Sequence, residues 1–157
     1  LIERRGSSLV ISREPTVSAG WFTWSDRDVV TVVAPHYALI EASGGADVDV
    51  DPLQLDTLDI DAGGGADVNA DGLRLDTLRI KAHGGADVNA YRLAITTLDA
   101  TSSGGADIQV SGDCRTANVA SSGGADFRGE DLRCESATVN ASGGGGTPQR
   151  SADRSRH

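Results

Sequence analysis

The amino-acid sequence predicts an all-β protein, folded as a single-stranded, right-handed parallel β-helix (a solenoid) with turns of about 20 residues. Three observations lead to this prediction. A Gly-Gly-Ala-Asp motif returns at a nearly constant period, apolar and polar residues alternate between its copies, and like residues fall into columns when the copies are aligned. Alternation with period two is typical of strands, and no segment has a useful helical period.

The repeat is marked by copies of the motif that start at Gly44, Gly64, Gly84, Gly104 and Gly123. A sixth start, Ser142-Gly143-Gly144, lacks the Ala-Asp pair, and the spacings are 20, 20, 20, 19 and 20 residues. A fixed period this short is typical of a solenoid, because one turn cannot bury its apolar face until a neighbouring turn stacks on it.

The strands of each turn are predicted to be separated by corners. In the first marked turn these corners fall at the Gly pair, near Asp51-Pro52 and near Asp56-Thr57, which gives two or three strands per turn. Turns joined in one direction form parallel ladders, and the preference for right-handed crossovers favours a right-handed coil. At about 4.8 Å per turn, the marked turns form a rod of about 25 Å. The predicted inward columns are Val48, Val68, Val88, Ile108 and Phe127; Leu58, Leu78, Leu98, Ala117 and Ala137; and Ile60, Ile80, Ala100, Val119 and Val139.

Three segments are expected: an N-terminal capping segment with the first irregular turns (1–42), the β-helix repeats (43–142) and a disordered tail (143–157). Counting back 20 residues places Val30 under Val50 and Ile40 under Ile60, so the repeat begins before its signature. The aromatic run Trp21-Phe22-Thr23-Trp24 is interpreted as part of the cap, with a sugar-binding platform as the alternative.

Charge and composition restrict the possible partners and the kind of core. The net charge is −9, and residues 41–140 hold 18 acidic against 7 basic residues, which disfavours nucleic acid as a partner. Apolar residues make up 38% and aromatic residues 4%, which suits a narrow aliphatic core. No apolar run approaches the ~20 residues of a membrane-spanning helix.

A column of aspartates is the strongest candidate for a site, and its members are Asp47, Asp67, Asp87, Asp107 and Asp126. Carboxylates about 4.8 Å apart repel by about 1 kcal/mol per pair in water. Bound calcium could offset this repulsion, but Ca²⁺ takes 6–8 oxygens and one column offers about two or three. The favoured interpretation is that each carboxylate accepts backbone N–H bonds at the Gly turn. No cofactor or metal is therefore predicted, and calcium remains the alternative.

Two further columns have structural interpretations. Thr57, Thr77, Thr97, Thr116 and Ser136 form a hydroxyl column, interpreted as a corner ladder because the flat double Thr row of ice-binding solenoids is missing. Cys114 and Cys134 fall in one inward column, one turn apart, within reach of a disulfide. Buried thiols are the favoured interpretation of this pair, with the disulfide as the alternative.

Catalytic residues are not predicted. Neither cysteine has a histidine near it in register, and His36, His83 and His157 have no metal-like spacing. Stacked acidic residues could mimic the carboxylates of carbohydrate-acting β-helices, but tight turns provide no evident cleft.

The runs from Val29 to Pro35, from Ala42 to Val48 and from Ser121 to Leu132 resemble the putative auto-transporter adhesin head domain, known as the GIN domain. The resemblance covers roughly Leu9 to Ser142, and its Ser-Gly-x-x-Asp repeat is fairly specific. It implies a parallel β-helix, usually exported to the bacterial envelope or surface, with an adhesion role and no catalytic residues.

We therefore expect a non-enzymatic bacterial cell-envelope or surface module with an adhesin-like binding or structural role. Its expected partner is a surface glycan or protein, and its open helix ends favour self-association. The alternatives are a carbohydrate-acting β-helix, resembling polysaccharide lyases or hydrolases, and a calcium-binding repeat protein.

Overall fold

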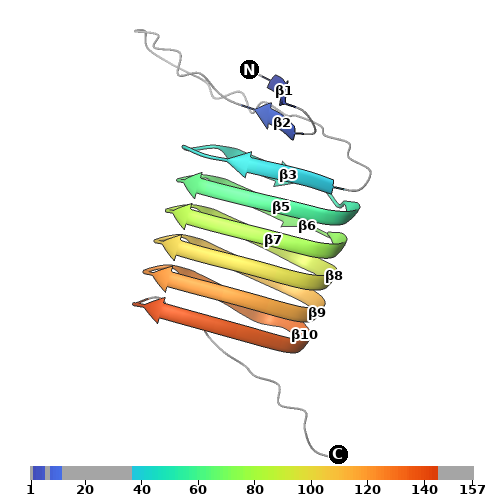
Figure 1. Cartoon of the computed structure of the whole chain (residues 1–157), viewed down its shortest axis with the longest axis vertical. Helices are drawn as coiled ribbons and strands as arrows, with labels where there is room; N and C mark the ends of the chain where they lie inside the picture. Colours follow the sequence, from blue (N-terminus) through green and yellow to red (C-terminus); the bar gives the residue numbers. More distant parts are fainter. Residues whose placement is uncertain (1, 6–7, 12–36, 145–157) are drawn as a thin grey trace, which may run out of the picture.

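The computed structural model describes residues 2–5, 8–11 and 37–144. This part of the chain is all-β with no helix, and its parallel strands stack as a β-solenoid of about 5 turns. Figure 1 shows the stack running from β3 to β10, one strand above the next. The predicted fold class is therefore confirmed, while the right-handed sense of the coil stays a prediction.

The main sheet follows the order β10-β9-β8-β7-β5-β3, and β6 pairs with both β4 and β8. From β8 onward a single long strand runs through most of each turn. The strands of the solenoid are β3 (Tyr37–Ala42), β4 (Asp47–Val50), β5 (Gln54–Gly64), β6 (Asp67–Asp71), β7 (Arg74–Gly84), β8 (Asp87–Gly104), β9 (Asp107–Gly123) and β10 (Asp126–Gly143).

The register confirms the predicted inward columns. Val48 pairs with Val68, Leu58 with Leu78 and Ile60 with Ile80, and each column continues through the later strands. The residues that fill the middle turns are fully buried, so the core is a narrow stack of aliphatic layers. Phe127 belongs to the same core, and its ring lies over Gly129, where a Cβ would come within 2.9 Å of it. The ring therefore fills the space beside this small residue.

The first corner of each turn depends on glycine. Gly64 has a φ of +72°, and a Cβ there would lie 3.1 Å from the backbone N of Gly44 in the turn before. The same left-handed conformation recurs at Gly84, which stacks on Gly64. Only glycine combines that conformation with so close an approach of successive turns, and this explains why the motif repeats.

The 19-residue turn is accommodated by two irregularities in the ladder. The register shifts between Ala90 and Leu93 on β8, and again between Arg128 and Asp131 on β10. At the first shift Arg92 adopts a left-handed φ of 53°, and its N–H donates to the Ser111 hydroxyl at 3.3 Å. Bulges on both neighbours therefore absorb the missing residue without disturbing the inward columns.

The N-terminal part of the structure shows where the repeat begins. β3 pairs in parallel with β5, with Ala38 opposite Leu58 and Ile40 opposite Ile60, so the repeat does begin before its signature. An antiparallel pair of strands, β1 (Ile2–Arg5) and β2 (Ser8–Ile11), precedes this stack. The aromatic run 21–24, the expected alignment of Val30 and the tail from residue 145 lie outside the described residues.

Candidate binding surfaces

The outward side chains of the solenoid form three faces, separated by the corners. The first face comprises β4, β6 and the beginnings of β8, β9 and β10. The second face is short and comprises residues 54–56, 74–76 and 94–96 with their counterparts in later turns. The third face comprises the remainder of each long strand up to the glycine corner.

The predicted aspartate column is present, and it lies on the first face. Asp47, Asp67, Asp87 and Asp107 pair in register, and Asp126 continues the column on β10. Partial burial raises the pKa of Asp87, and the charges of Asp107 and Asp67 add to this rise. These carboxylates therefore repel one another in the folded protein.

Arg128 relieves the repulsion at one end of the column. Its guanidinium lies 3.2 Å from an Asp107 oxygen and 3.3 Å from an Asp126 oxygen. Sequence reasoning did not assign this role to Arg128, although its place two residues after Asp126 was a usable signal, because side chains at i and i+2 share one face of a strand.

At the glycine corners, backbone N–H groups donate to backbone carbonyls of the preceding turn. Gly65 N donates to Gly44 O at 2.7 Å, and Asp67 N donates to Ala46 O at 2.9 Å. The next turn repeats this arrangement with Gly85 N and Gly64 O at 2.6 Å. Carbonyls of the preceding turn therefore accept these particular N–H groups, and the role of the aspartate carboxylates as acceptors of corner N–H groups stays a prediction.

Metal binding gains no support from this column. Within residues 2–5, 8–11 and 37–144, no group of three or more His, Cys, Asp or Glu residues is arranged to hold a metal ion. A single column directs its carboxylates side by side along the rod instead of around a common centre. Calcium binding by the aspartates stays a hypothesis that a stability measurement can test.

A second column on the first face consists of amides. Asn69 Nδ2 donates to Asp49 Oδ1 at 3.2 Å, and Asn89 Nδ2 donates to Asn69 Oδ1 at 3.1 Å. Gln109 lies in register with Asn89 and extends the column. These bonds run parallel to the long axis of the solenoid, so they fix the orientation of each amide group.

Beside this amide column lies Tyr91, whose side chain is 36% exposed. Its hydroxyl donates to Asn89 Oδ1 at 3.4 Å. The next residue, Arg92, forms a two-pronged ion pair with Asp71, with Nε donating to Oδ1 at 2.6 Å and a second bond from Nη2 to Oδ2. This cluster was not predicted from the repeat, because Tyr91 occupies the place where the preceding turn has Asp71.

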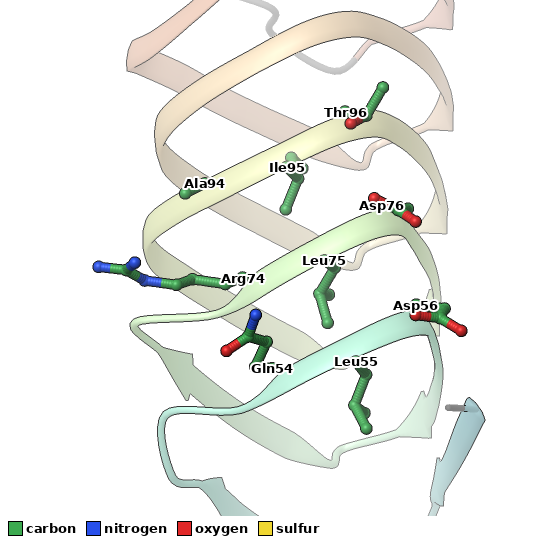
Figure 2. Close-up of a pocket in the computed structure, with 9 residues that line it drawn as sticks. All are labelled: Gln54, Leu55, Asp56, Arg74, Leu75, Asp76, Ala94, Ile95 and Thr96. Atoms are coloured by element: carbon green, nitrogen blue, oxygen red, sulfur yellow. The ribbon is translucent and has the colours of Figure 1, made fainter. Parts of the chain in front are cut away.

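The second face carries a shallow pocket of about 560 Å³. Figure 2 shows Gln54 and Arg74 on one side, Asp56, Asp76 and Thr96 on the other, and Leu55, Leu75 and Ile95 between them. The three apolar side chains belong to the core. The pocket is therefore a polar-rimmed depression over the backbone of three successive turns, and it offers a second surface for a ligand.

The third face carries alternating charges. Arg79 lies 3.2 Å from an Asp59 oxygen and 4.0 Å from an Asp99 oxygen, and Asn118 donates to Asp99 at 2.9 Å. The hydroxyl column is also in register here, as Thr57 pairs with Thr77 and Thr77 with Thr97. Exposed pairs of this kind contribute about 0–1 kcal/mol each, so this face is a solvated ladder.

Cys114 and Cys134 form a disulfide between β9 and β10, with their Cα atoms 4.5 Å apart. The favoured interpretation of two buried thiols is therefore wrong. Cys114 and Cys134 are direct partners in the β9–β10 ladder, so their side chains lie next to each other in one column. The predicted register was correct, and parallel register alone brings the two side chains within bonding reach.

The stacked turns, inward aliphatic columns and outward polar ladders define a β-solenoid repeat protein. Residues 2–154 match the family described as putative auto-transporter adhesin, head GIN domain, so the chain belongs to this family. Comparisons with curated proteins and with solved structures give no match. Family membership suggests a location at the cell surface or outside the cell. In the described part of the chain there is no helix long and apolar enough to cross a membrane.

Proposed function

We propose that this protein is a non-enzymatic, adhesin-like module of the bacterial cell envelope or surface, which binds a surface glycan or protein along its outer faces. The observation that carries this proposal is the regular spacing of polar side chains on tight turns. A solenoid presents the same kinds of group at intervals of about 4.8 Å, which suits an extended or repetitive ligand.

The disulfide between Cys114 and Cys134 supports export of the protein. A disulfide such as Cys114–Cys134 persists in the oxidising periplasm or outside the cell, and it is rare in the reducing cytosol. The family description agrees with such a location. Cell-envelope or extracellular placement is therefore part of the proposal.

A purely binding role is favoured over catalysis by the shape of the turns. Carbohydrate-acting β-helices need a cleft with protruding carboxylates placed on both sides of the scissile bond. The described turns of this chain are joined by short glycine corners, and the Arg74 side of the second-face pocket faces acidic groups across a shallow depression. Such a surface can hold a ligand without surrounding a reacting bond.

The test is binding of the purified, fluorescently labelled chain to intact bacterial cells, with periodate-treated and protease-treated cells as the two competing conditions. We expect saturable binding that one of the treatments removes. Absence of saturable binding to any cell surface contradicts the proposal. Release of sugar fragments from the cells during the incubation contradicts its non-enzymatic part.

A further inference from the structure

We propose that the first face binds a neutral glycan, with the ring of Tyr91 as the platform for one sugar and the amides of Asn69 and Asn89 as its hydrogen-bonding partners. This inference rests on the proposed function, since it names a ligand class and a place on the outer surface. Three features of the cluster around Tyr91 support it.

The first feature is the orientation of the ring. Tyr91 and Asn89 are two residues apart on β8, about 6.6 Å along the strand. Because the Tyr91 hydroxyl reaches Asn89 Oδ1, the ring lies back along the strand instead of standing upright. Among the described side chains, Tyr91 is the large hydrophobic residue that is exposed. A ring held in this way offers a flat apolar surface to the C–H face of a pyranose, while its hydroxyl stays in contact with water.

The second feature is the amide ladder. Asn89 uses one N–H toward Asn69, and Asn69 uses one N–H toward Asp49. Each amide group has two N–H donors and a carbonyl oxygen with two acceptor sites, so each keeps unused capacity that faces solvent. Sugar hydroxyls both donate and accept, and groups already fixed in position lose less entropy when they bind them.

The third feature is the local charge balance. The Arg92–Asp71 pair lies beside Tyr91 and cancels its own charge. The rest of the face carries the aspartate column and Asp49, so an acidic polymer is repelled. A neutral glycan meets neither repulsion nor an uncompensated charge at the platform, and together with the exposed ring of Tyr91 this favours a neutral sugar.

The experiment uses the full chain in affinity electrophoresis through gels that contain dextran, laminarin, mannan or polygalacturonate. We expect at least one of the three neutral polysaccharides to retard the protein, and the acidic polygalacturonate not to do so. Tyr91→Ala should raise the apparent dissociation constant about tenfold or more, as loss of a binding hot spot does. Tyr91→Phe keeps the ring, and we expect an increase of about fivefold or less.

Matched controls separate this inference from the wider proposal. Lys81→Ala removes an exposed charge from the third face and should leave retardation unchanged. Arg74→Ala with Asp76→Ala alters the second-face pocket instead. If the double variant loses retardation and Tyr91→Ala keeps it, the Tyr91 platform is overturned while the binding function stands. Retardation by polygalacturonate alone, or by none of the four polymers, overturns the neutral-glycan assignment, and the cell-binding test still decides the proposed function.

Discussion

The middle turns and the last described turn carry the same repeat but bury very different amounts of it. Ile80 on β7 is fully buried between two neighbouring turns, whereas Val139, in the same column on β10, is only partly buried. Ala137 and Ala141 on β10 are exposed although their counterparts in the middle turns form the core. An inward side chain of a solenoid is therefore buried by the neighbouring turns and not by its own turn alone, as nearest-neighbour stacking requires.

The largest effect is expected from a truncation in the middle of the stack. Ile80→Ala should lower the free energy of unfolding by about 2–5 kcal/mol, because it leaves a cavity between two layers. Val139→Ala removes atoms that already contact solvent and should lower it by about 1 kcal/mol or less. Chemical denaturation followed by circular dichroism measures both variants. Equal losses would show that the end turn is as well packed as the middle.

The disulfide is expected to compensate for the poor packing of the end turn. It closes a loop with a sequence separation of 20, for which constraint of the unfolded chain contributes about 3 kcal/mol. Reduction, or Cys114→Ser with Cys134→Ser, should therefore speed amide hydrogen exchange in β10 first. Exchange in β7 is the internal control. Protection of β10 that stays the same after reduction contradicts this role.

A smaller effect, of opposite sign, is expected at a buried hydroxyl. The Ser102 hydroxyl is buried and has no hydrogen-bond partner in the described structure, and Ala82 occupies the same column one turn earlier. Ser102→Ala should raise the free energy of unfolding by about 1 kcal/mol. Ser121 is the matched control, because its hydroxyl donates to Ala125 O at 2.7 Å. Ser121→Ala should be destabilising, and a gain in both variants would refute the explanation.

The aspartate column should give a weak pH dependence. The pKa of Asp87 is raised in the folded state, so the folded protein holds this proton more tightly than the unfolded chain does. Asp87 therefore contributes most to stability below pH 3.8, its ordinary pKa, and this contribution is lost as the pH rises through the pKa of the folded state. Asp87→Asn should slightly raise the melting temperature at pH 7 in low salt but have no such effect at pH 3. High salt should reduce this gain only in part, because screening weakens repulsion between exposed charges but not the burial that is the main cause of the raised pKa. A gain that is as large at pH 3 as at pH 7 contradicts this account.

Calcium should have the smallest effect of all. Weak extracellular sites bind at about 10⁻⁴–10⁻³ M, so calcium at about 5 mM would occupy such a site. We expect the melting temperature to be the same in calcium and in chelator, because one column cannot surround the ion. A rise of several degrees that Asp67→Asn with Asp87→Asn removes would make the aspartates a cation site.

Most of the fold could be predicted from the sequence, because a repeat fixes the register of every residue once one turn is aligned. The inward columns and the glycine corners followed from that alignment alone. The binding surfaces could not be predicted in the same way, since they arise where the repeat is broken. Tyr91 and Arg92 replace the Asp71-Gly72 pair of the turn before, and the 19-residue turn adds a bulge beside them.

The central claim is that this surface holds a glycan without cleaving it. The most direct measurement is the size distribution of a neutral polysaccharide that retards the protein, determined by size-exclusion chromatography before and after prolonged incubation. We predict that the polymer is recovered at its original size and without new chain ends. Shortened chains with new reducing or unsaturated ends, formed by the wild-type protein, would contradict the account and identify a carbohydrate-cleaving enzyme.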